Sequence, residues 1–175
     1  MKTRLVACFL LLLSTLCAQN NLTTTATQRY FDVIRRSLEA SADIMPAEKS
    51  SYRLTPAQMT FAEWNNHSTQ RNYLDCGVLR GEASRMSEQQ AAQLKEKAEV
   101  AKALKESFAY CAEALQKVDD QKVISSPQMA NAFLHLVVHN NEIYGNIVGM
   151  HEPTQIAHRA APTARPRRVK PASFG

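Results

Sequence analysis

The fold class follows from residues 95–118, which read KEKAEVAKALKESFAYCAEALQKV. Alanine, leucine, lysine and glutamate, the residue types with the highest helix propensity, dominate this stretch. Its larger side chains recur at steps of three and four residues, a period that places them on one face of a helix. That face carries Lys105, Phe108, Cys111, Leu115 and Val118. The stretch therefore predicts a long amphipathic helix.

Three further segments, residues 25–42, 56–79 and 127–150, predict helices of similar length. The second and third begin with Thr55-Pro56 and Ser126-Pro127, each a capping residue before proline at the first helical position. Between the middle two long helices, Ser87 and Gln90 form a capping-box pattern for a short helix within 82–93. The sequence contains no strand-like alternation. We therefore expect an all-α protein, a four-helix bundle with a long connection between helices two and three.

The composition is that of a globular protein of 175 residues, with 45% hydrophobic and 21% charged residues. This length fits one domain. The formal net charge is +5, but seven of the 21 basic residues lie in the first four residues or after Ala157. Residues 19–157 therefore carry 14 basic and 16 acidic side chains. A body with this balance lacks the basic face of a nucleic-acid-binding domain, so we expect no specific nucleic-acid partner.

The two ends of the chain differ from this body. Residues 1–18 have a basic start, an apolar run and a small residue, Ala18, before polar residues, as in a secretory signal peptide. The apolar run is shorter than the ~20 residues that span a bilayer, so we favour cleavage over a retained anchor and expect no transmembrane span afterwards. We expect a secreted or periplasmic protein. The basic, proline-containing tail, residues 157–175, predicts disorder.

Cleavage after Ala18 would remove Cys8 and Cys17 and leave Cys76 and Cys111 in an oxidising compartment. Two cysteines there indicate one disulfide, with two separate buried thiols as the alternative. A zinc site built on cysteines is disfavoured, because the chain left by this cleavage has no Cys-x-x-Cys and no third thiol.

Three motifs resemble the DinB-like superfamily. They are Tyr52-Arg53-Leu54-Thr55-Pro56 with Thr60-Phe61 and His67, Phe108-Ala109-Tyr110-Cys111, and His139 to Asn146. The resemblance covers roughly residues 25–151 and is greatest for secreted members. It implies an up-down-down-up bundle and a divalent metal (Zn, Ni, Fe or Mn) held by three histidines. Relatives include thiol-dependent S-transferases and isomerases, and bundle faces often pair, which makes a homodimer one expected state.

The implied topology determines whether Cys76 and Cys111 can lie close enough to form a disulfide. If helices two and three run parallel, Cys76 and Cys111 lie about 20 and 16 residues into their helices, heights within roughly 6 Å of each other. An antiparallel pair would separate them beyond the span of a disulfide. The resemblance therefore strengthens the prediction of a Cys76–Cys111 bridge.

The implied metal site departs from the family pattern at its third position. Carried over residue by residue, the ligands fall on His67, His139 and Ile143, and isoleucine cannot coordinate a metal. Glu142 and Glu63 are the candidate substitutes, each one turn from a histidine. His135 repeats the four-residue spacing with His139, but the apolar face of its helix predicts that it points outward. Two imidazoles alone bind transition metals weakly.

Two hypotheses follow. The favoured one is an exported DinB-like protein with a degenerate metal site, acting as a binding or structural module for an unidentified small molecule or protein. The alternative is a metal-dependent hydrolase or thiol-dependent transferase that uses His67, His139 and a replacement ligand such as Glu142. The low-molecular-weight thiols that such transferases use are chiefly cytoplasmic, which weighs against the alternative in an exported protein.

Overall fold

The computed structural model describes residues 21–151, and within this range every regular element is a helix, with no strand. The all-α prediction is confirmed. The predicted signal peptide (1–18) and tail (157–175) lie outside the described residues. The elements are α2 (Leu22–Ile44), a short 3₁₀ turn (Ala47–Lys49), α3 (Phe61–Arg80), α4 (Glu88–Gln93), α5 (Lys97–Leu115), α6 (Asp120–Ile124) and α7 (Pro127–His151).

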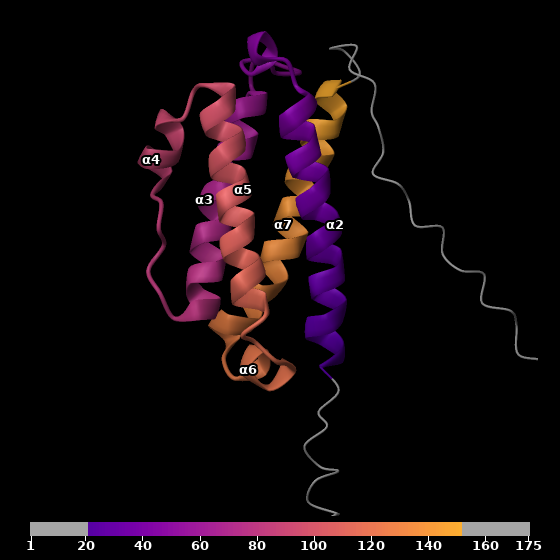
Figure 1. Cartoon of the computed structure of the whole chain (residues 1–175), viewed down its shortest axis with the longest axis vertical. Coiled ribbons are helices and arrows are strands. Elements are labelled where there is room, and N and C mark those ends of the chain that lie inside the picture. Colours follow the sequence, from indigo (N-terminus) through magenta and orange to yellow (C-terminus); the bar gives the residue numbers. More distant parts are fainter. Residues whose placement is uncertain (1–20, 152–175) are drawn as a thin grey trace, which may run out of the picture.

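The four long helices α2, α3, α5 and α7 enclose a shared apolar core (Figure 1). α3 packs against both α5 and α7, and α2 packs against the same two helices. The short α4 packs on α3, and its connecting segments run along the outside of the molecule (Figure 1). The core side chains that are almost completely buried include Leu38, Leu104, Phe108, Phe133, Leu136, Ile143 and Ile147.

Most helix ends lie where the capping residues predict them. Ser87 and Gln90 form the predicted reciprocal capping box at the start of α4. The Ser126 hydroxyl accepts a hydrogen bond from the backbone N–H of Met129 in the first turn of α7. These two starts are confirmed. The segment between α5 and α7 contains the short helix α6, whose N-cap is Asp119.

The predicted start of α3 at Pro56 is wrong, because the helix begins at Phe61 with Thr60 as its N-cap. Thr60 and Glu63 form a capping box in which each side chain accepts a hydrogen bond from the other residue's backbone N–H. Two more N–H groups of the first turn are satisfied by carbonyl groups of the preceding segment, Phe61 by Tyr52 and Ala62 by Ser50. All of these partners favour the later start.

The buried face of α3 is mainly polar. Ser68 donates a hydrogen bond to Asn140 of α7 (2.6 Å), and Asn140 donates to Asn72 (2.8 Å). Asn72 in turn donates to Ser107 of α5 (3.0 Å). All four residues are 2% exposed or less, so this polar network lies inside the core and joins three helices. Buried hydrogen bonds of this kind favour a single register, since any slip leaves polar groups unpaired.

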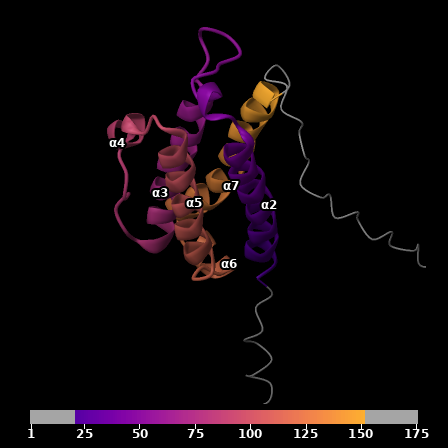
Figure 2. The same ribbon diagram turned by 45° about the horizontal axis from the view of Figure 1, so that its top comes forward.

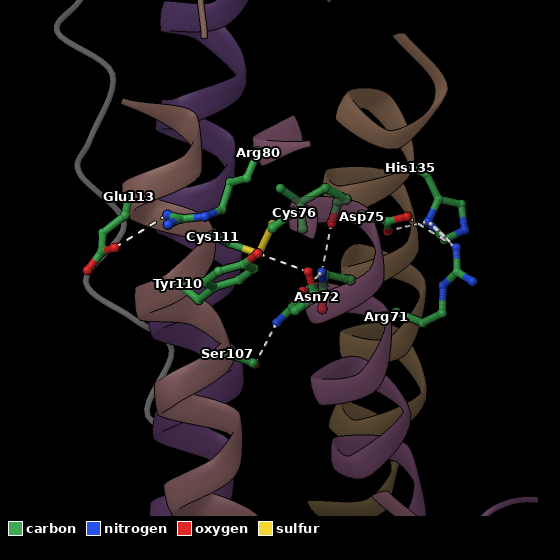
Figure 3. The surroundings of a disulfide bond; sticks show 12 residues. Arg71, Asn72, Asp75, Cys76, Arg80, Ser107, Tyr110, Cys111, Glu113 and His135 are labelled. Atoms are coloured by element: carbon green, nitrogen blue, oxygen red, sulfur yellow. Dashed lines mark hydrogen bonds and ion pairs between the residues drawn. A yellow bond between two sulfur atoms is a disulfide. The ribbon is translucent and has the colours of Figure 1, made fainter. Parts of the chain in front are cut away.

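Cys76 of α3 and Cys111 of α5 lie with their sulfur atoms at disulfide-bonding distance, as predicted (Figure 3). Their Cα atoms are 5.3 Å apart, within the usual range for a disulfide. Both residues are completely buried. The bridge fixes the relative heights of α3 and α5 one helical turn from Asn72 and Ser107.

In residues 21–151, no helix is long and apolar enough to cross a membrane.

Candidate functional site

The structure brings His67 of α3 and His139 of α7 into direct contact. Their Nε2 atoms are 2.9 Å apart, and the two rings meet edge to face. Both side chains are half-buried, and the Trp64 ring lies edge-on to His67. The two histidines that the sequence singles out therefore form one site where α3 packs on α7.

The hydrogen bonds around His139 determine how the pair shares its protons. Nδ1 of His139 lies 3.3 Å from Oε2 of Glu142, and a carboxylate only accepts, so this contact favours the tautomer with the proton on Nδ1. In that tautomer of the neutral ring, Nε2 of His139 is the acceptor for the Nε2–H of His67. The two Nε2 atoms that face each other are thereby hydrogen-bonded to each other.

Glu142 lies on the opposite side of the His139 ring from His67, since it contacts Nδ1 and not Nε2. In this arrangement it orients the imidazole, and its carboxylate does not face the point at which the two Nε2 atoms converge. The second substitute, Glu63, is engaged at the cap of α3 and lies 3.8 Å from Arg53. Its hydrogen bond with the Thr60 backbone N–H lowers the pKa of the Glu63 carboxyl group.

Burial lowers the pKa of His67 below its ordinary value of 6.5, and the neighbouring His139 and Arg71 lower it further. His67 is therefore neutral at pH 7. The unfolded chain takes up a proton on this residue near pH 6.5, whereas the folded chain does so only at lower pH. This difference makes the folded state less stable as the pH falls from 6.5 towards the folded-state pKa, and leaves its stability unaffected above pH 7.

The third position of the implied ligand set, Ile143, is part of the core. It is completely buried and belongs to the same apolar cluster as Phe133, Leu136 and Ile147. The side chain therefore fills space between helices and offers no donor to the histidine pair.

A second polar cluster, not predicted from the sequence, adjoins this pair. Nδ1 of His135 lies 2.7 Å from Oδ2 of buried Asp75, whose other oxygen pairs with Arg71 at 3.2 Å (Figure 3). The His135 ring stacks on His139, with centroids 4.6 Å apart. The prediction that His135 points outward is therefore only partly right, because the side chain is about one-third exposed and is paired.

The four-residue spacing was the signal that could have revealed this cluster. His67, Arg71 and Asp75 follow one face of α3 at four-residue intervals, and His135 and His139 do the same on α7. Residues at this spacing lie one above another on a helix. Two such polar rows on packed helices indicate a contact between them.

A pocket of about 490 Å³ opens beside His67. Its floor is one face of α3, formed by Glu63, Asn66, His67 and Gln70, and one wall is α4 with Ala91 and Ala92. The Asn66 side-chain amide donates to the Leu94 carbonyl and ties this wall to α3. The volume lies in the range of small-molecule sites.

The side chains at the His67–His139 contact do not provide the ligand set of a metal centre. A catalytic metal site usually has three protein ligands directed at one point. In residues 21–151, no group of three or more histidine, cysteine, aspartate or glutamate side chains is arranged to hold a metal ion. His67 and His139 supply two converging nitrogens, and Ile143 supplies none. The described residues do not fit a three-histidine centre in this arrangement.

Comparisons of the chain with protein-family models, with curated protein sequences and with solved structures found no match.

Proposed function

We propose that this chain is an exported, DinB-like protein whose divalent-metal site is degenerate, and that it acts as a binding module rather than a metal enzyme. The proposal includes the finer architecture, an up-down-down-up four-helix bundle. Support for that architecture comes from the contacts of α3 with α5 and α7, and from the Cys76–Cys111 pair, which lies at matching depths in α3 and α5.

One observation carries the functional part of the proposal. Ile143, at the third ligand position of the family pattern, is completely buried among core side chains. Replacing Ile143 by a metal-binding side chain would remove core packing. This position therefore stabilises the fold and does not supply a ligand. The two remaining histidines satisfy each other by a hydrogen bond, and neither requires a metal to complete its contacts.

The pocket beside His67 is the binding site in this proposal. Its lining combines apolar walls from Ala91 and Ala92 with the polar floor of α3, a composition typical of sites that orient a small ligand. The matched pair Ala92→Phe and Ala98→Phe tests this location, because Ala92 lines the pocket whereas Ala98 is exposed on α5 outside it. In a thermal-shift screen of small amines, carboxylates and sugars, a genuine pocket ligand stabilises the Ala98→Phe variant but not the Ala92→Phe variant.

The alternative function, a metal-dependent hydrolase or thiol-dependent transferase, is favoured by a single feature, the convergence of the two Nε2 atoms on one point. It needs a third donor, and Glu142 would have to leave Nδ1 of His139 to supply one. Titration with Zn²⁺ or Ni²⁺ by calorimetry distinguishes the two proposals. The degenerate site gives weak binding that His67→Ala abolishes, whereas binding that persists after dialysis against a chelator supports the enzyme.

A further inference from the structure

Unpaired amide groups gather around the pocket beside His67. In residues 21–151, four buried side-chain amide oxygens have no hydrogen-bond partner, those of Gln58, Asn65, Asn66 and Gln70. All of these residues except Asn65 line this one pocket. A buried acceptor that has lost its water without gaining a partner destabilises the fold, so native proteins keep few of them. Their concentration at one pocket indicates that a ligand of the pocket is the missing partner.

Asn66 is the best defined of the three. Its Nδ2 donates to the Leu94 carbonyl at 2.8 Å, and a carbonyl only accepts, so the orientation of the amide is fixed and Oδ1 is the unpaired atom. Asn66 is 5% exposed, and Gln70, one turn further along α3, is 7% exposed. The unpaired atom of Gln70 is likewise its side-chain oxygen. The pocket therefore presents acceptors that call for a hydrogen-bond donor.

The charged side chains of the lining select among donors. The described residues that line the pocket include two carboxylates, Glu63 and Glu88, and one ammonium group, Lys95, a net charge of −1. A carboxylate ligand would place acceptor against acceptor. A neutral hydroxyl group would leave the negative charge uncompensated. A primary ammonium group donates three hydrogen bonds and carries the complementary charge.

A neighbouring cavity of about 430 Å³ provides a comparison, since it shares Glu63, Asn66 and Lys95 with the pocket. Its lining is balanced in charge, with three basic and three acidic side chains, namely Arg53, Lys95, Lys97, Glu48, Glu63 and Glu96. Of the three unpaired amides, Asn66 alone lines this second cavity. The full set of acceptors and the net negative charge therefore coincide only in the pocket beside His67.

The rest of the lining suits an alkyl chain. Ala57 and Met59, from the segment before α3, and Ala91 and Ala92 of α4 supply apolar surface. In both views α4 lies on the outer side of α3, away from α2, so the pocket is at an edge of the molecule (Figures 1 and 2). The volume of about 490 Å³ is larger than an ammonium group alone requires. The occupant therefore carries an organic chain beside its charged group.

We propose that the pocket beside His67 binds a primary alkylammonium ion, whose ammonium group donates hydrogen bonds to the side-chain oxygens of Asn66 and Gln70 and whose charge is offset by Glu88. The proposal rests on the proposed binding function of the same pocket and adds the chemical class of the ligand. Neighbouring atoms cover both oxygens in the structure, so binding includes a small shift of the side chains that cover them. The alkyl chain lies against the alanines of α4.

Calorimetric titration with three probes of one chain length, pentylamine, 1-pentanol and pentanoate, tests the charged group. The protein is the purified chain expressed in an oxidising compartment, at pH 7. We expect pentylamine to bind about tenfold more tightly than either other probe, because charge-assisted hydrogen bonds are stronger than neutral ones. The Ala92→Phe variant is expected to lose this binding and the Ala98→Phe variant to keep it.

The outcomes separate the ligand class from the location of the site. Absence of pentylamine binding, or equal or tighter binding of 1-pentanol or pentanoate, overturns the ammonium proposal. If Ala92→Phe blocks the binding of one of those two probes, the pocket remains the binding site. Pentylamine binding that Ala92→Phe leaves unchanged overturns both the ligand class and the pocket.

Charge variants on the surface give effects of opposite sign. Glu88→Gln is expected to weaken pentylamine binding about two- to fivefold, and Lys95→Gln to strengthen it by a similar factor. Glu48→Gln is the matched control, because Glu48 is an exposed carboxylate that lines only the neighbouring cavity, and it is expected to have no effect. Equal affinities of the Glu88→Gln and Glu48→Gln variants contradict the proposal.

The Gln70→Met variant distinguishes a ligand contact from a packing feature. Methionine has a similar length and no unpaired oxygen, so the protein without ligand is expected to melt at a higher temperature. Pentylamine binding is expected to weaken about tenfold, because the ammonium group loses an acceptor. A more stable variant with unchanged affinity would show that Gln70 does not contact the ligand. The Glu88 and Lys95 variants test the proposal without altering the buried residues.

Discussion

The bridge between Cys76 and Cys111 gives the most quantitative prediction. The two residues are 35 positions apart, and the loop that they close contains α4. The loop-closure entropy of a chain segment of this length corresponds to about 4 kcal/mol of stabilisation at 25 °C. Because both residues are completely buried, reduction changes few contacts with solvent in the folded state. We expect reduction to lower the free energy of unfolding by about 4 kcal/mol.

The assay is urea denaturation, followed by circular dichroism, of the protein expressed in an oxidising compartment, in oxidised and reduced form. For a protein of this size, about 4 kcal/mol lowers the urea midpoint by roughly 2 M. Alkylation in denaturant without reductant is expected to leave Cys76 and Cys111 unmodified. The double variant Cys76→Ala/Cys111→Ala is the control and is expected to unfold at the same urea concentration with or without reductant. Identical midpoints for oxidised and reduced wild type, together with free alkylation, would establish two separate thiols and refute the reasoning.

Two further predictions concern the polar core and the histidine pair. Asn140→Ala leaves the buried hydrogen-bond partners Ser68 and Asn72 unpaired, so urea denaturation should show the free energy of unfolding lowered by about 2–5 kcal/mol. The control Asn146→Ala loses one exposed hydrogen bond and should cost less than ~1 kcal/mol. The melting temperature of wild type should fall between pH 7 and pH 5.5, and His67→Gln should reduce that fall; an unchanged profile would exclude His67 as its source.

The fold class was predictable because local signals were consistent with one another. The helix-forming composition of residues 95–118 and the caps at Ser87 and Ser126 each indicate the observed helix. The α3 start was not predictable from the Thr55-Pro56 signal alone. Thr60 offers a competing cap, and the carbonyl groups that satisfy the next N–H groups come from a segment whose path the sequence does not specify.

The candidate site was predictable in part. The resemblance named His67 and His139, and the structure places them in contact. The cluster of Arg71, Asp75 and His135 was missed, because a helix face was assigned from its apolar residues alone. The buried face of α3 is mainly polar, so hydrophobic periodicity does not predict which of its residues face the core. Only the packing of α3 against α7 reveals which polar residues find partners.

The measurement that tests the central claim most directly is elemental analysis of the chain, expressed with export to the periplasm and purified without a histidine tag, beside its His67→Ala variant. A degenerate site predicts that neither protein retains a stoichiometric amount of zinc, nickel, iron or manganese. About one equivalent of metal in the wild type that is lost in His67→Ala would contradict the account, and would require a third ligand that joins the histidine pair.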